Sequence, residues 1–193
     1  MIDSISKLNE CLSIEKQLYQ EIGYKGRLHA YISKCEVGAL YEYMRVLRKD
    51  EYYTNKMSCN VIDKVKSRYY RRKHNIMGIK LGISIPVNTF GKGLLIYHSQ
   101  GIIVHKDSRC GEFCKLHGMN CIGNNGTGDG CNNVPQIGDC VDIGVGAIII
   151  GNVHLAGHTK IAAGCVVCKD FNTEYQVLAG VPAKLLKLDN SEE

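Results

Sequence analysis

The feature that most constrains the fold is a six-residue repeat that runs from Ile137 to Val167. No helix has a period of six, and a two-residue strand alternation does not require glycine or alanine beside each aliphatic residue. The repeat therefore predicts a β-solenoid, in which each hexad makes one short strand and one corner, and three hexads close a triangular coil. The expected core residues are the repeated aliphatics Ile137, Ile143, Ile149, Leu155, Ile161 and Val167, and the residues four positions after them, Val141, Ala147, Val153, Thr159 and Cys165.

The same period continues, less regularly, on the N-terminal side of this stretch. Val104, Cys110, Leu116 and Ile122 share one phase, with Ile102 and Cys114 at the accompanying inward position. Residues 123–136 then interrupt the repeat with a Gly- and Asn-rich sequence in which Val134 is the one expected core residue. We interpret this segment as a loop that leaves one corner of the solenoid, and loops of this length are often functional.

The N-terminal part of the chain has helical periodicity instead. Helices are expected over residues 3–21, 28–48 and 58–74, with Asp3 or Ser4 as a cap for the first. In the third helix, Val61, Val65, Arg68 and Tyr69 are expected to face inward. The predicted organisation is a helical segment over 1–75, a solenoid domain over 76–187 and a flexible tail over 188–193.

Composition excludes several classes of protein. The 193 residues contain no apolar run of 18 or more, so no membrane span is expected, and the N-terminus lacks the apolar core of a secretory signal. Ten cysteines without such a signal indicate the reducing cytoplasm. The pair Cys165 and Cys168 has metal-like spacing, but the hexad register directs Cys165 inward and Cys168 outward, so no metal site is expected.

Much of the net charge of +5 lies in one run, from Lys64 to Lys73, that also contains two tyrosines. Such a run can bind nucleic acid, but no nucleic-acid-binding motif accompanies it. We therefore interpret it as the solvated face of a helix and expect no nucleic-acid partner.

Three stretches carry a resemblance to a known family. Residues 85–104 (IPVNTFGKGLLIYHSQGIIV), 116–123 (LHGMNCIG) and 179–184 (AGVPAK) resemble the left-handed β-helix acyltransferases, and within them the serine acetyltransferase group. The likeness covers about 60–187 and is closest to the short members linked with surface-polysaccharide synthesis. The resemblance implies a left-handed parallel β-helix, mostly β, behind a small helical segment, and acetyl transfer from acetyl-CoA to a hydroxyl.

The resemblance also implies roles for particular residues. His98 matches the catalytic histidine, which acts as a general base, and follows the phase of the core positions. His117 is expected on the next coil, stacked near His98, as a second base, an orienting group or an acceptor contact. The implied acetyl-CoA contacts are Gly123 and Asn124 for the thioester oxygen, Gly144, Val145, Ala162 and Ala163 for the pantetheine arm, and Lys169 and Lys184 for the phosphates.

Two departures from the family pattern concern the acceptor and the base. The positions of the aspartates beside the catalytic histidine are occupied here by Ile83 and Tyr97. The Arg-His pair that helps to hold the amino-acid acceptor falls on Asn133 and Val134. A zwitterion needs charged partners to replace its hydration, so the acceptor remains open between serine and the hydroxyl of a sugar or nucleotide sugar.

The family implies a homotrimer with active sites between subunits, and the residues leave open whether the helices join two trimers. Two alternatives also remain open at this point. A γ-carbonic anhydrase would share three histidines per zinc across subunits, but no third histidine accompanies His98 and His117 convincingly. A solenoid scaffold without activity is the other alternative, favoured by the missing aspartates.

Overall fold

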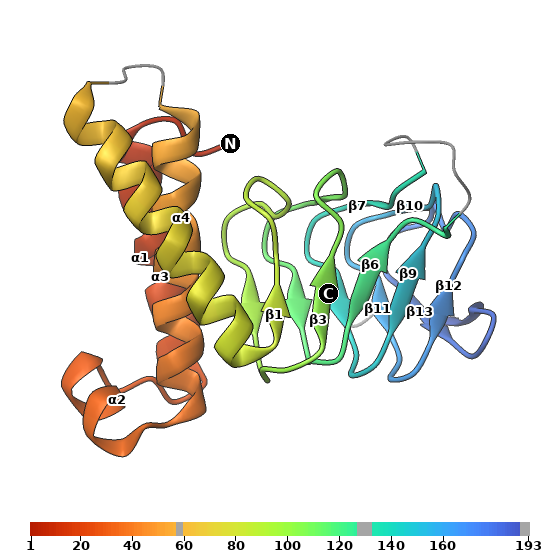
Figure 1. Cartoon of the computed structure of the whole chain (residues 1–193). Helices are drawn as coiled ribbons and strands as arrows, with labels where there is room; N and C mark the ends of the chain where they lie inside the picture. Colours follow the sequence, from red (N-terminus) through yellow and green to blue (C-terminus); the bar gives the residue numbers. More distant parts are fainter. Residues whose placement is uncertain (57–59, 127–132, 190–193) are drawn as a thin grey trace.

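The computed structural model describes residues 1–56, 60–126 and 133–189. The helices form one end of the molecule, and the strands follow one another along a solenoid away from them (Figure 1). In the described residues, no helix combines the length and the apolar character needed to cross a bilayer.

Four helices precede the solenoid: α1 (Ile5–Glu21), α2 (Arg27–Ser33), α3 (Glu36–Asn55) and α4 (Val61–Leu81). Ser4 caps α1 as predicted, because its hydroxyl accepts the amide hydrogen of Lys7. The single helix expected over 28–48 is wrong. Lys34 adopts a left-handed conformation with a φ of 49°, which ends α2, and the chain restarts as α3 two residues later.

The third predicted helix is α4, and two expectations about it are wrong. It continues to Leu81, so the predicted boundary at residue 75 falls inside it, and Gly82 ends it in the left-handed region. Val61, Val65, Arg68 and Tyr69 are exposed rather than inward. The reason is that α4 packs on α3 through polar groups: buried His74 contacts Asp50 and Tyr43 of α3.

The solenoid has three sheets of parallel strands, with one antiparallel strand, β14, at its end. The five-strand sheet contains β1 (Ile83–Ser84), β3 (Ile102–Val104), β6 (Cys121–Gly123), β9 (Ile148–Ile150) and β12 (Val166–Val167). The three-strand sheet contains β4 (Arg109–Cys110), β7 (Gln136–Ile137) and β10 (His154–Leu155). The six-strand sheet contains β2 (Leu95–Ile96), β5 (Lys115–Leu116), β8 (Asp142–Ile143), β11 (Lys160–Ile161), β13 (Gln176–Ala179) and β14 (Lys184–Leu188).

The core positions predicted from the hexads are confirmed. Every residue of both predicted sets between Ile137 and Val167 is buried, as are the earlier inward positions from Ile102 to Ile122. Ile143 pairs with Ile161, which holds the same place in the repeat three hexads further along, so three hexads make one coil. Cys165 is buried and Cys168 exposed, as the register predicted.

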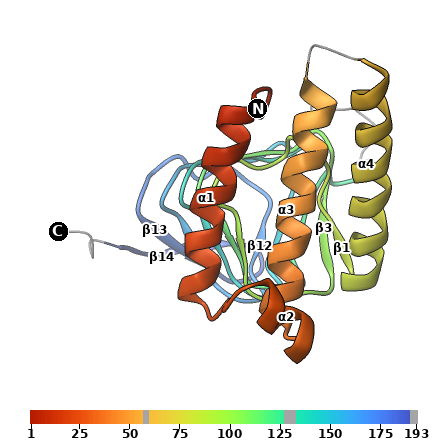
Figure 2. The same cartoon turned by 90° about the vertical axis from the view of Figure 1, so that its left-hand side faces the viewer.

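The helices and the solenoid share this core. Tyr19, Leu40 and Met44 belong to the same buried cluster as Leu94 and Ile96 of the first coil. Figure 2 shows α1, α3 and α4 side by side at the near end of the solenoid. The helices therefore close one end of the β core with apolar side chains.

Two segments differ in their bounds from the prediction. The loop is shorter than 123–136, since Gly123 belongs to β6 and Gln136 to β7, and Val134 is buried as expected. The predicted tail begins too early, because Leu188 belongs to β14, which turns back through Gly180 to pair with β13. Residues 127–132 of the loop and 190–193 of the tail lie outside the described residues.

Candidate active site

The corner that contains His98 is longer by two residues than the corner stacked on it. Three hexads after Ile96 would be Cys114, but Ile96 pairs with Leu116, whereas Val104 pairs with Ile122 at the regular interval of three hexads. The extra length lies between β2 and β3. It is held against the end of α4, because the amide of Gln100 donates to the carbonyl of Leu81 at 2.7 Å.

Because of this insertion, the two histidines do not lie where the sequence predicted. His98 does not replace a core aliphatic residue: its side chain is 66% exposed, and Ile96 is the core residue at that point of the coil. His98 lies over Gly118 on the next coil, and the ring that stacks on His117 is that of Tyr97, with centroids 4.4 Å apart. The histidines are therefore neighbours on adjacent coils, one position out of register.

A carboxylate from the helical segment holds His98. Oε2 of Glu36 lies 3.3 Å from Nδ1 of His98, and Oε1 accepts hydrogen bonds from the amide and the hydroxyl of Ser99, both at 2.7 Å. The Ser99 amide bond is the largest cause that lowers the pKa of Glu36 below its ordinary 4.5, with His98 contributing. Glu36 thus places a carboxylate beside His98, whereas Ile83 and Tyr97 have none.

Sequence reasoning missed Glu36, which precedes His98 by 62 residues. Glu36 is the first residue of α3, and the helix is fixed by buried side chains further along it, such as Tyr43 and Leu47. No local signal marks this contact, because it depends on how the helical segment docks on the first coil.

His117 has a carboxylate partner of its own. Its Nε2 lies 2.8 Å from Oδ1 of Asp142, which projects from β8 on the following coil. Buried Asn120 fixes the corner between them, since its amide group donates to the carbonyl of Gly144 at 2.8 Å and accepts from the amide of Gly118. The corner therefore presents two imidazoles, each hydrogen-bonded to a carboxylate.

Several of the predicted acetyl-CoA contacts lie along the same edge of the solenoid as the histidines. This edge joins the six-strand sheet to the five-strand sheet, and we call it the histidine edge. It contains, in successive coils, His98, His117, Gly144 and Val145, Ala162 and Ala163, and then Lys184 at the start of β14.

The remaining predicted contacts lie on the opposite edge of the five-strand sheet. Gly123 ends β6 and Asn124 follows it, and Lys169 follows β12, where its ammonium lies 5.4 Å from the ring centre of Phe171. Within one chain these three residues do not approach the histidines.

The two glycines among these contacts have different structural reasons. A Cβ at Gly144 would lie 2.6 Å from the carbonyl oxygen of Ile161, so coil stacking itself requires glycine there. A Cβ at Gly123 would meet only His105, at an ordinary 3.8 Å, so packing does not require glycine at that position.

The positions that hold an amino acid in the family carry no charge here. The amide of Asn133 donates to the side chain of Asn125 at 2.6 Å, and Val134 is buried in the core. Within the described residues no group of three His, Cys, Asp or Glu side chains converges as a metal site would.

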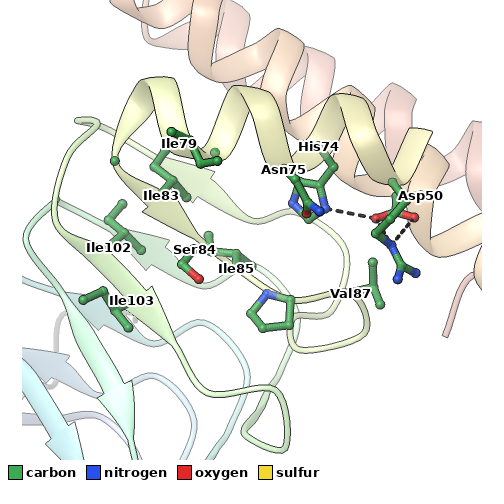
Figure 3. Close-up of a pocket in the computed structure, with 14 residues that line it drawn as sticks. Asp50, His74, Asn75, Ile79, Ile83, Ser84, Ile85, Val87, Ile102 and Ile103 are labelled. Atoms are coloured by element: carbon green, nitrogen blue, oxygen red, sulfur yellow. Dashed lines mark hydrogen bonds and ion pairs between the residues drawn. The ribbon is translucent and has the colours of Figure 1, made fainter. Parts of the chain in front are cut away.

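A cavity of about 710 Å³ lies away from the histidine edge, between α4 and the first strands. Figure 3 shows Ile79, Ile83 and Ile103 around it, with the hydrogen-bonded Asp50 and His74 at its far end. Neither catalytic candidate lines this cavity.

Comparisons with known proteins support the resemblance inferred from the sequence. No family model matches the chain. Serine acetyltransferase 4 of Arabidopsis thaliana is 35% identical over 107 residues, covering 54% of this chain and 29% of the relative. The serine acetyltransferase of Haemophilus influenzae is 33% identical over 107 residues, covering 55% and 39%. The chain spans between 29% and 50% of the length of the curated relatives it matches.

Solved structures show the same fold over nearly the whole chain. Serine acetyltransferase from Brucella abortus strain S19 superposes with a TM-score of 0.73 at 20% identity, over 96% of this chain and 71% of that one. The Neisseria gonorrhoeae enzyme gives 0.69 at 23% identity, over 96% and 69%. A further Brucella abortus structure, in complex with coenzyme A, gives 0.69 at 20% identity, over 96% and 70%. The helical segment followed by a parallel β-solenoid is thus the serine acetyltransferase fold.

Proposed function

We propose that this protein is an acetyl-CoA-dependent O-acetyltransferase resembling serine O-acetyltransferase, with His98 as general base. The observation that carries the proposal is the contact of Glu36 with His98 at 3.3 Å. A general base must present one imidazole nitrogen to the acceptor while the other nitrogen is held. Glu36 supplies that second contact, and the exposed His98 leaves Nε2 available.

His98, held by Glu36, then moves one proton from the acceptor hydroxyl to the leaving sulfur. Nδ1–H of His98 donates to Glu36, so Nε2 carries the lone pair that removes the hydroxyl proton of the acceptor as its oxygen attacks. The carboxylate stabilises the imidazolium formed in this step. The same Nε2–H then protonates the sulfur that leaves, which returns His98 to its starting form.

Acetyl-CoA supplies an acyl carbon activated as a thioester and a thiol as leaving group. The histidine edge fits its long arm, because Val145 and Ala163 are exposed and small or medium in size, and exposed Lys184 offers a charge for phosphate. Gly123 fits the thioester end of acetyl-CoA. Packing within the chain does not require glycine at this position, and the absence of a side chain leaves the backbone accessible.

We infer a homotrimer that is built through the five-strand sheet. The outward residues paired across this sheet are Ser84 on the first coil and then four apolar residues, Ile103, Cys121, Ile148 and Val166. The corresponding row of the three-strand sheet is Arg109, Gln136 and His154. That of the six-strand sheet has Lys115, Asp142 and Lys160 at its centre, between buried Leu95 and half-buried Val177. An apolar face between two polar ones favours contact with another copy. Covering it would bring the Gly123 edge of one subunit toward the histidine edge of another.

The second candidate acceptor is a sugar or nucleotide-sugar hydroxyl. Asn133 and Val134 favour a sugar acceptor. Asn133 has an uncharged amide that is hydrogen-bonded to Asn125, and Val134 is buried. Neither offers a countercharge to an ammonium or carboxylate group. From the likeness to the serine acetyltransferases we also infer that the solenoid coil is left-handed and that the protein acts in the cytoplasm.

The experiment measures thiol release from acetyl-CoA by the full chain, first with serine and then with a panel of sugars and nucleotide sugars. We expect turnover with at least one acceptor and a loss of about 10²–10⁴-fold in His98→Ala. Glu36→Gln keeps the shape but removes the charge, so kcat falls with little change in KM for acetyl-CoA.

Two residues outside the histidine corner supply matched controls. Glu42→Gln alters another carboxylate of α3, which pairs with Arg27 and Arg45, and His154→Ala removes a histidine on the three-strand sheet. Both variants retain activity under the proposal. Full turnover in His98→Ala, or no turnover with any acceptor, would show that the assignment is wrong.

A further inference from the structure

Helix α4 carries an apolar seam that faces away from its own chain. The seam consists of Ile62, Val65, Tyr69, Ile76 and Ile79, with Arg72 between Tyr69 and Ile76, at alternating intervals of three and four residues. Its apolar members are between 42% and 82% exposed. This spacing is that of the a and d positions of a heptad repeat, which is the contact pattern of one helix against another.

The opposite side of α4 already has its partner. Asp63, His74 and Gly78 are buried against the rest of the chain, and α4 stands at the outer edge of the helical segment (Figure 2). The seam is therefore an additional face rather than the core face of the helix. At its C-terminal end Ile79 borders the cavity that Ile103 also lines (Figure 3), so the seam ends where the sheet face proposed for the homotrimer begins.

Basic side chains border the seam along both sides. Lys66, Lys73 and Lys80 follow one side, and Lys64 and Arg68 follow the other. Arg71 lies on that second side too, but it is already paired with Asp50 of α3. Asp63, which is the one acidic residue of α4, is buried and paired with Lys56. In a paired helix, such flanking charges select the partner.

These charges decide between possible occupants. Two copies of α4 would bring lysines and arginines against each other, which disfavours a second copy of this helix. A bilayer would have to take up Arg72 from within the seam, and the seam has β-branched side chains and one tyrosine where membrane-surface helices have Trp, Phe and Leu. An acidic helix satisfies both features, because its carboxylates can pair with the flanking bases and with Arg72.

We propose that the α4 seam is a docking site for an acidic amphipathic helix of another protein. The seam runs from Ile62 to Ile79, which corresponds to about 27 Å of helix. The partner presents apolar a and d positions, glutamates at its e and g positions, and an acidic group opposite Arg72. This inference does not depend on acetyl transfer, since the seam and the histidine edge belong to different elements.

The test uses a dye-labelled synthetic helix of three heptads with leucine at a and d, glutamate at e and g, and one glutamate placed to face Arg72. Fluorescence anisotropy follows its titration with the full-length protein. We expect saturable binding that weakens at least tenfold in Val65→Asp and in Tyr69→Asp, and that weakens again at 0.5 M salt. A matched control, Ile5→Asp at an exposed position of α1, keeps the affinity of the natural sequence.

A charge exchange makes the test specific. A second peptide carries lysine in place of every glutamate and should not bind. The variant Lys66→Glu, Arg68→Glu, Lys73→Glu, Lys80→Glu should reverse this preference. All substituted side chains are solvent-accessible, so we expect each variant to fold. Circular dichroism melting curves check that it does.

Four results would overturn the proposal. The acidic peptide fails to bind folded protein, or the lysine peptide binds equally well. Vesicles containing phosphatidylglycerol, or a nucleic-acid duplex, bind the protein and compete for the seam in preference to the acidic peptide. Finally, Val65→Asp changes the mass of the protein in light scattering, which would assign the seam to contact between copies.

Discussion

The phenol ring of Tyr97 lies flat against the imidazole of His117, with 4.4 Å between ring centres and 11° between planes. Asp142 holds the same imidazole through Nε2 at 2.8 Å. His117 is therefore fixed both in the plane of its ring and along its edge, while its other nitrogen is left without a partner in the contacts described for this ring.

Removing the stacked ring should loosen His117 without unfolding the protein. We expect Tyr97→Ala to lower kcat for acetyl transfer by up to about tenfold, since such ring pairs contribute about 0.5–1.5 kcal/mol. Tyr97→Phe retains the flat ring and should stay within about twofold of the natural protein. The measurement is thiol release from acetyl-CoA, and an equal loss in both variants would assign the effect to the hydroxyl instead.

Acidification should weaken the contact between the helical segment and the histidine corner. The folded pKa of Glu36 lies below its ordinary 4.5, with hydrogen bonds from Ser99 as the largest cause. The stabilisation is thus complete above about pH 4.5 and is lost as pH falls through the folded pKa. We expect the melting temperature of the natural protein to exceed that of Glu36→Gln at pH 6, and the difference to shrink as the pH is lowered below 4.5. A constant difference would contradict this linkage.

Arg48 joins the helices to the first coil from a fully buried position. Its guanidinium pairs with Glu15 and Glu51 and donates to the carbonyls of Phe90 and Gly91. Arg48→Met would leave two buried carboxylates unpaired, so we expect a loss of about 3–5 kcal/mol in the free energy of unfolding. Urea denaturation measures it.

The control for Arg48 is Arg45→Met on the same helix. Arg45 is partly exposed and pairs with Glu42 within one turn. Such a pair contributes well under 1 kcal/mol, so the two arginines should differ by several-fold in their effect. Similar losses for both would mean that the buried network does not hold the helices on the coil.

The two glycines of the proposed cofactor site should separate stability from activity. Gly144→Ala would place a methyl group 2.6 Å from the Ile161 carbonyl oxygen and should lower the melting temperature by several degrees. Gly123→Ala meets only His105 and should melt like the natural protein. Its methyl group would obstruct the thioester end, so KM for acetyl-CoA should rise. Calorimetry and the thiol-release assay distinguish these outcomes.

Local pattern was sufficient for much of the solenoid. Each hexad from Ile137 onward buries its predicted residues, because a coil of three hexads returns the same position to the same side of the core. The pattern failed at His98, where the phase of Val104 continues by coincidence across the insertion. Counting back six residues from Val104 gives His98 as a core position, but the two-residue insertion moves that position to Ile96. The sequence period alone does not show where such an insertion lies.

The face of α4 could not be predicted for a different reason. Val61, Val65 and Tyr69 form the apolar stripe that normally faces a core, and hydrophobicity was the basis of that expectation. The actual core face includes His74, which is satisfied by Asp50 and Tyr43. Polar groups bury without penalty only when partners from other elements meet them, and those partners are distant in sequence.

The sequence by itself determined the solenoid, its register from Ile137 to Val167, and the choice of His98 and His117 as candidate site residues. Only the tertiary structure decided that Glu36 holds His98, that Tyr97 rather than His98 covers His117, and which side of α4 is free. The physical reason is the range of the interactions. Hexad periodicity arises from neighbouring residues that repeat a local geometry, whereas the orientation of the catalytic candidate depends on a helix that docks from 62 residues away.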